Sequence, residues 1–271
     1  MDFSNWHTYD HYGYALLAVF GTFAAVAAIH WLMHRSPWAG WVRSLNGVVP
    51  PFINIIGVLF GLTLAFLAND TWSAHDRAMN AVYKEADALR SLVVLNSQLE
   101  EPQRSQLGEA LNDYANASVA EWSLLGDYAN ASVAEWSLLA QRKSSPEVSA
   151  KADHLLTLLG SHAMAKAAGD NVQALMLRKV TDIRDERDLR IGLSQTHINP
   201  LKWLGMAFLG LLTLLSVAVV HAENPRAAFV AIMLFALAAA PTAAIVLVQG
   251  NPFQQPSSVS PAPIAAALAE H

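Results

Sequence analysis

The sequence has no cysteine among its 271 residues, which excludes disulfide bonds, thiolate nucleophiles and cysteine metal sites. Charge is also scarce. Only 14% of the residues are charged and 54% are hydrophobic, whereas soluble proteins average about 25% and about 45 to 50%. The formal net charge is −5, and no stretch concentrates basic residues as a nucleic-acid-binding face requires. We therefore expect a lipid bilayer as the main partner and no nucleic acid.

Motifs of enzymes and cofactor-binding proteins are missing as well. The chain has no serine nucleophile elbow and no glycine loop that would cradle a phosphate. Two histidine pairs, His7 with His11 and His30 with His34, have the spacing of one helical turn, but no third donor completes a His-Glu-x-x-His type of site. We expect no enzyme activity, no catalytic residues, no cofactor and no metal.

Four uncharged apolar runs are long enough to cross a hydrocarbon layer of about 30 Å, which takes about 20 helical residues. They cover residues 14–33, 48–68, 204–222 and 227–248. Tryptophans lie at or near the run ends, where an amphipathic ring suits the headgroup zone. Residues 1–13 contain no lysine or arginine, unlike the opening of a cleaved signal peptide, so we expect the first run to be retained. The runs predict an all-α, polytopic membrane protein with four transmembrane helices in two pairs, 1–68 and 203–248.

A polar segment, residues 69–202, separates the two pairs and is predicted to be a helical extramembrane insert. Apolar residues recur at spacings of three and four from Ser73 to Leu99, as on an amphipathic helix. Pro102 and the stretch "SSPE" at 144–147 mark the starts of two more helices, and Gly169 marks a further break. The predicted stripe of the first helix is Met79, Val82, Ala86, Leu89 and Val93. Residues 249–271 are predicted to form a Pro-rich C-terminal tail.

Residues 112–139 contain a tandem duplication, in which a fourteen-residue unit is written twice with only its first residue changed. The apolar stripe that begins at Leu107, Leu111, Tyr114 and Ser118 is repeated in the second copy. Fourteen helical residues turn about 1400°, about 40° short of four full turns, so an inserted copy lengthens a helix by about 21 Å and barely rotates its apolar face. We interpret the repeat as a duplication without a function of its own; the alternative is a helix lengthened to protrude.

Lysine and arginine are distributed unevenly among the short segments. Arg35 and Arg43 lie between the first two runs and Arg226 lies between the last two, whereas neither tail has a basic residue. The positive-inside rule places such loops in the cytoplasm. It therefore predicts that the insert and both tails are periplasmic.

The stretch 57–92, "GVLFGLTLAFLANDTWSAHDRAMNAVYKEADALRSL", resembles the segment that defines the bacterial bestrophin-like-domain family of four-helix integral membrane proteins. A glycine-containing helix runs into Phe66, Trp72 and a Glu-Ala-x-x-Leu pattern at Glu85 to Leu89. The segments "DYANASVAEW", "RDERDLR" and "NPFQQPSSVSP" follow in the family's order. The chain departs at "QGNPF", where relatives have Asp-Arg before Pro-Phe, which removes any role for an arginine there. The resemblance implies a bacterial inner-membrane protein and kinship with eukaryotic anion channels that assemble as pentamers.

Two functions are consistent with these features. The resemblance favours an oligomeric ion channel, built from copies of this chain, whose second membrane helix lines the path. The alternative is a non-conducting envelope protein whose helical insert senses stress or binds a protein partner.

The second membrane helix carries a face of small and polar residues that includes a Gly-x-x-x-Gly pattern. Small residues at this spacing let helices approach closely, and in a channel the same face could border a pore with an apolar constriction. Close packing is the simpler interpretation, and both stay open. The candidate pore or packing residues are Asn54, Gly57, Phe60, Gly61, Leu64 and Ala65.

Charged residues supply two further candidates. Asp70 and Trp72 are predicted to lie at the membrane boundary. Glu85 lies at the buried edge of the first insert helix, and Arg184 and Arg187 lie on the last. If those helices are antiparallel neighbours, a carboxylate–guanidinium bridge can join them. A structural clasp is the preferred interpretation, with ion coordination and signal coupling as alternatives.

Overall fold

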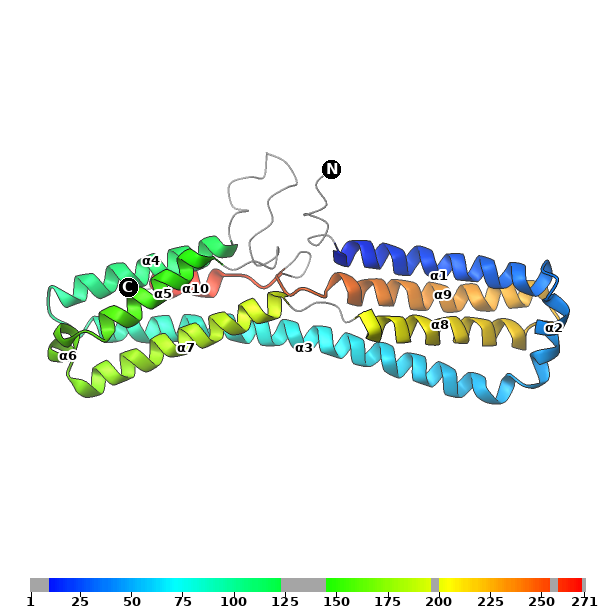
Figure 1. The fold of residues 1–271 in the computed structure, drawn as a ribbon, viewed down its shortest axis with the longest axis horizontal. Coiled ribbons are helices and arrows are strands. Elements are labelled where there is room, and N and C mark those ends of the chain that lie inside the picture. The colour runs from blue at the N-terminus through cyan, green and yellow to red at the C-terminus, as the bar shows by residue number, and fades with distance from the viewer. Residues whose placement is uncertain (1–9, 123–144, 196–199, 254–257, 270–271) are drawn as a thin grey trace, which may run out of the picture. The chain divides into compact units, whose positions relative to one another are not determined.

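The computed structural model describes residues 10–122, 145–195, 200–253 and 258–269, and all regular structure within these ranges is helical (Figure 1). The all-α prediction is therefore confirmed. The elements are α1 (Asp10–His34), α2 (Ala39–Ser44), the 3-10 turn η2 (Leu45–Gly47), α3 (Pro50–Asn96), α4 (Gln103–Trp122), α5 (Pro146–Leu159), α6 (His162–Ala168), α7 (Asp170–Gln195), α8 (Pro200–Val220), α9 (Pro225–Val248) and α10 (Ala262–Ala269).

The chain forms two compact units. The first, here called the membrane unit, comprises residues 1–73 and 197–250. Its four long helices α1, α3, α8 and α9 contain stretches long and apolar enough to cross a membrane. These are the helices that the four apolar runs predict.

The membrane unit exposes many large side chains and buries several alanines. Phe20 and Leu17 are 69% and 67% exposed, whereas Ala236 and Ala240 are buried in α9. This arrangement suits lipid, because a hydrocarbon solvent does not drive large apolar groups inward and small residues allow helices to approach closely. The helices of this unit are therefore held together by the fit of their side chains more than by the exclusion of large apolar groups from the solvent.

The second membrane run and the first insert helix are one continuous helix, α3, of 47 residues. The sequence predicts a boundary at residues 68 and 69, but α3 has no end there. The physical reason is that polarity changes at this point while nothing interrupts the helix: no glycine or proline occurs between Gly61 and Pro102. Asp70 consequently lies inside a helix and not at a helix end.

The second unit, here called the insert unit, comprises residues 74–196 and 251–271. Four of its helices carry buried stripes at alternating spacings of four and three, as in helix bundles. The predicted α4 stripe is confirmed, since Leu107, Leu111, Tyr114 and Ser118 are all buried. The predicted α3 stripe is confirmed at Val82, Ala86 and Leu89, which are buried, and is wrong at Met79, which is exposed while Ala78 is buried in its place. The second copy of the duplication lies outside the described residues.

The C-terminal segment belongs to the insert unit. Phe253, Val259, Ile264 and Ala267 are buried in the same core cluster as the insert helices. The Asn251 side-chain oxygen accepts a hydrogen bond from the Phe253 amide, and the Val259 amide donates to the Pro252 carbonyl. The described part of the predicted Pro-rich tail therefore packs as part of the insert unit.

Helix breaks in the insert unit follow the sequence signals. Pro146 is in the first turn of α5, and Gly169, between α6 and α7, has a φ of 76°. A positive φ is easily adopted only by glycine, so this residue allows the chain to turn between the two helices. The short helix α6 was not anticipated. The side chain of Ser161, the N-cap residue that precedes α6, accepts a hydrogen bond from the Met164 amide.

Candidate functional site

The candidate residues on the membrane part of α3 divide into two groups. Phe60 is buried, and Leu64 packs against the core cluster that includes Met206 and Val246. Asn54, Gly61 and Ala65 are exposed and Gly57 is half-buried. The structure thus brings Phe60 and Leu64 into packing within the chain and leaves the small and polar residues uncovered.

Phe60 makes the closest of these contacts. A Cβ atom added to Gly210 on α8 would lie 3.1 Å from Cε2 of Phe60, so the glycine makes room for the ring. The ring of Phe235 on α9 is 5.3 Å away, centroid to centroid. At Gly57 and Gly61, by contrast, an added Cβ would meet nothing within 4 Å. The Gly-x-x-x-Gly pattern is therefore not a close contact between helices of one chain.

The boundary residues Asp70 and Trp72 both contact the other membrane helices. The Lys202 ammonium is 2.7 Å from the Asp70 carboxylate, with both side chains more than half exposed. The Trp72 indole N–H donates to the side-chain oxygen of Gln249 at 3.0 Å. These bonds join α3 to α8 and to the end of α9 within the membrane unit. Exposed pairs of this kind contribute little stability, about 0 to 1 kcal/mol.

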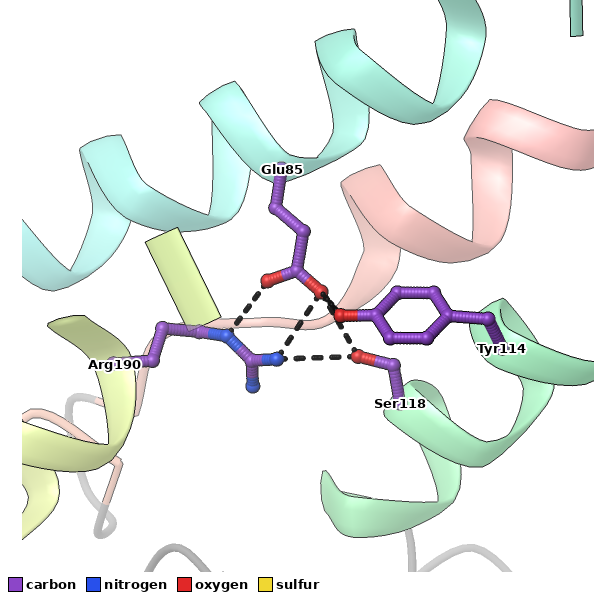
Figure 2. Close-up of polar contacts among 4 residues, drawn as sticks. All are labelled: Glu85, Tyr114, Ser118 and Arg190. Atoms are coloured by element: carbon purple, nitrogen blue, oxygen red, sulfur yellow. Dashed lines mark hydrogen bonds and ion pairs between the residues drawn. The ribbon is translucent and has the colours of Figure 1, made fainter. Parts of the chain in front are cut away.

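A buried polar cluster lies in the insert unit (Figure 2). Arg190 on α7 donates from Nε to one oxygen of Glu85 on α3 at 2.8 Å and from Nη2 to the other at 3.2 Å. Tyr114 and Ser118 on α4 donate to that second oxygen at 2.9 and 3.1 Å. All four side chains come from buried stripe positions. Their hydrogen bonds connect α3, α4 and α7.

The electrostatics of the cluster are those of a neutral phenol facing a carboxylate. Burial raises the pKa of Tyr114 well above its ordinary value of 10.0, and the negative charge of Glu85 raises it further, while Arg190 opposes the shift. The phenol therefore keeps its proton and donates a hydrogen bond to Glu85. Removing one partner of such a buried pair costs about 3–5 kcal/mol, because it leaves an uncompensated charge.

The partner of Glu85 differs from the predicted one. Arg184 pairs with Asp153 at 3.1 Å, and Arg187 donates to the Ser149 hydroxyl and the Ser145 carbonyl. The arginine that holds Glu85 is Arg190. The reason is the register of α3 against α7, which the helix sequences alone do not specify.

A signal for Arg190 was nevertheless present in the sequence. The buried stripe of α7 runs through Met176, Val180, Ile183, Arg187, Arg190 and Ser194, spaced alternately by four and three. Arg190 falls on this stripe, whereas Arg184 is one residue off it. An arginine in a core stripe requires buried hydrogen-bond acceptors or a buried acidic partner.

No group of three or more His, Asp or Glu side chains in the described parts of the chain could hold a metal ion. His30 and His34 contact each other, with ring centroids 4.8 Å apart.

The fold is similar to solved structures of bacterial membrane proteins. A point mutant of a bacterial bestrophin homologue from Klebsiella pneumoniae superposes with a TM-score of 0.61 at 15% identity, covering 96% of this chain and 93% of that one. A second point mutant of that homologue gives 0.59 at 15% identity, covering 94% and 95%. A crystal structure described as that of a membrane protein, also a point mutant, gives 0.62 at 13% identity, covering 94% and 95%. At these identities the likeness shows the fold alone.

No curated protein sequence matches this chain. The family model for the bestrophin-like domain matches residues 20–264, which include most of the first membrane helix, the other three and the insert. The fold, the four spans and this match agree with the resemblance seen in the sequence. The chain belongs to the bestrophin-like domain family and is a helical membrane protein of bestrophin type.

Proposed function

We propose that copies of this chain assemble into an ion channel in which the uncovered small-residue face of α3 lines the path. The observation that carries this proposal is a difference between two uncovered flanks of the same helix. One flank presents Asn54, Gly61 and Ala65, with the exposed Val58 on the same stripe. The other presents large apolar side chains, namely Ile55, Leu59, Leu62 and Phe66, which are 47 to 67% exposed.

The apolar flank is suited to lipid, but the small-residue flank is not. A carboxamide in hydrocarbon needs a hydrogen-bond partner, and Asn54 has none among the described residues. Hydroxyls elsewhere in the unit meet this need within their own helix, as when Thr63 donates to the Leu59 carbonyl. An amide cannot be satisfied in this way as readily, so Asn54 requires water or a neighbouring subunit. A water-filled path between subunits supplies both.

Reconstitution of the full-length protein in a planar bilayer tests the proposal. We expect ion currents, and we expect Gly61→Leu to reduce them strongly, because it adds bulk to the lining face. Leu62→Phe is the matched control, since it adds bulk on the lipid-facing flank and should leave the current unchanged. Asn54→Leu is expected to alter conductance or ion selectivity, because it removes the polar group of the path.

Two results would contradict a channel. One is silence in the bilayer when insertion has been verified, and the other is a monomeric mass in detergent, since one chain offers no closed path. Either would favour the non-conducting alternative, in which the insert senses stress or binds a partner.

Topology is tested separately. The charge of the short loops predicts a periplasmic insert, and the shared core requires the C-terminus to be on the same side. A reporter that is active only in the cytoplasm, fused after His271, should be silent. Activity of that fusion would place the insert and tail in the cytoplasm and contradict the loop-charge prediction.

A further inference from the structure

The turn between α1 and α3, at one end of the membrane unit, is built with its largest apolar side chains outward. The short helix α2 buries Ala39 and Val42, which are 6% and 4% exposed. Trp38 and Trp41, which flank these residues, are 66% and 62% exposed, and their rings contact each other edge to face at 6.5 Å. A tryptophan pair turned away from the protein core fits the headgroup zone, where an apolar ring with one N–H donor has suitable surroundings on both sides.

The same end of the unit carries positive charge without matching negative charge. Arg35 and Arg43 are exposed, and the chain has no Asp or Glu from residue 11 to residue 69. Arg226, in the first turn of α9, is also exposed, and its loop contributes one acidic residue, Glu223. None of the three arginines forms an ion pair with a described residue. A chain with a net charge of −5 therefore concentrates uncompensated cations here.

One of these arginines is held in place by the backbone. The Arg43 Nε donates to the Ala39 carbonyl at 3.1 Å, which fixes the base of the guanidinium against α2 and leaves its terminal amino groups without a partner among the described residues. A guanidinium fork presented in this way matches two oxygens of a phosphate. Trp41 also lies on α2, and Trp38 immediately precedes the first residue of α2.

We propose that this surface, defined by Arg35, Trp38, Trp41 and Arg43, binds the headgroup phosphate of anionic phospholipids. The arginines recognise the phosphate charge and the tryptophan rings occupy the adjoining interface. Free phosphate would use only the arginines and would leave two exposed indoles unexplained, so a lipid is the source that fits both observations. The inference depends on the chain being a membrane protein and does not depend on ion conduction.

Native mass spectrometry of the full-length protein, equilibrated in detergent with equal amounts of phosphatidylglycerol and phosphatidylcholine, tests this proposal. We expect the wild type to retain phosphatidylglycerol preferentially. In Arg35→Gln/Arg43→Gln that retention should fall by about fivefold for each arginine removed, as expected for basic residues at an anionic surface. Arg35→Lys/Arg43→Lys should keep most of it. Trp38→Ala/Trp41→Ala should lower the retention of both lipids.

The matched control is Lys166→Gln/Arg178→Gln, which removes two exposed cations of the insert unit that form no ion pair with a described residue. It should leave lipid retention at the wild-type level. Helical content and oligomer mass of each variant show whether it has folded. Equal retention of both lipids, or an Arg35→Gln/Arg43→Gln variant that matches the control, would overturn the proposal. Displacement of phosphatidylglycerol by millimolar inorganic phosphate would overturn the lipid as the source and leave a simple anion site.

Discussion

The two units satisfy polar side chains on their helices in different ways. In the membrane unit, Thr22, Thr213 and Thr242 each donate to the carbonyl four residues earlier in their own helix. In the insert unit, Glu85 is bonded by side chains from two other helices. These threonine hydroxyls are hydrogen-bonded within their own helices. They would stay hydrogen-bonded if one membrane helix shifted against another. The insert helices have a single register that satisfies the cluster.

The solvent explains this difference. In a bilayer no water is present to satisfy a polar group while helices assemble, so groups bonded within their own helix are safest. In the insert, helices assemble from water, and a buried cluster can form late and select one arrangement. This comparison predicts that point changes in the insert cluster cost more stability than changes of the same chemistry in the membrane unit.

The largest effect is expected for Arg190→Met. It leaves the Glu85 carboxylate buried without its cation, which should lower the free energy of unfolding of the insert by about 3–5 kcal/mol. Urea titration of the protein in micelles, followed by far-UV circular dichroism, measures the loss. Arg184→Met is the control, because its pair with Asp153 is largely exposed and should contribute no more than about 1 kcal/mol. Equal losses in the two variants would refute the cluster's structural role.

Tyr114→Phe is expected to cost about 1.5–3 kcal/mol, the usual contribution of a hydrogen bond to a charged group. It should also change how the free energy of unfolding depends on pH at alkaline pH. The raised pKa means that the folded insert keeps the phenolic proton when the unfolded chain, above pH 10.0, has released it. Stability is therefore complete below that pH and declines as the pH rises above it.

The decline should be shallower in Tyr114→Phe, which has no such proton to release. Urea titrations between about pH 8 and about pH 11, a range around the ordinary tyrosine pKa of about 10, would measure it. Tyr83→Phe, which removes an exposed phenol, is the control. Identical slopes in Tyr114→Phe and the wild type would mean that the Tyr114 hydroxyl is not buried in the folded protein.

Gly210→Val tests packing by shape in the membrane unit. The new side chain meets the Phe60 ring, so we expect a loss of about 1–3 kcal/mol, as for overpacked cores. Gly61→Val introduces the same group where nothing lies within 4 Å and should leave the packing of a single chain intact. Thermal denaturation of the two variants in the same detergent, with the oligomer mass of each recorded, compares them. A greater loss for Gly61→Val would show that its face is packed within one chain.

The smallest expected effects come from removing single hydroxyls, one from each unit. Ser118→Ala removes a donor to Glu85 and should cost about 1–3 kcal/mol, because a buried charge loses a partner. Thr213→Val removes a bond internal to its own helix and should cost about 0.5 kcal/mol, the lower end for a bond between neutral groups. Unfolding of the two variants in the same micelles gives the difference. A larger loss of stability in Thr213→Val than in Ser118→Ala would contradict the claim that bonds within one helix suffice for the membrane-unit hydroxyls.

Much of the fold could be predicted from local signals. The four membrane helices follow from uninterrupted apolar runs, and Pro146 and Gly169 mark the starts and breaks that the structure contains. The α4 stripe followed from helical spacing because its burial depends on one face of one helix. Local patterns of this kind need no knowledge of neighbouring helices.

The change of polarity near residue 69 does not by itself indicate whether a helix ends there, and the structure shows that α3 continues through it. Two other features were missed because they depend on what lies beside each helix. Arg190 was passed over for Arg184 and Arg187, although its place on the buried stripe was readable. The burial of Ile264 in the insert core required a contact between segments more than a hundred residues apart, since α10 packs against α4.

The sequence by itself determined which helices are apolar enough for lipid and which have one face suited to water. Hydrophobicity and helical periodicity are properties of the residues within one segment. Only the tertiary structure decided which arginine meets Glu85, which face of α3 stays uncovered and where the C-terminal segment packs. Those outcomes depend on the register and rotation of one helix against another, and these are decided by the sum of many small packing terms distributed over the whole chain.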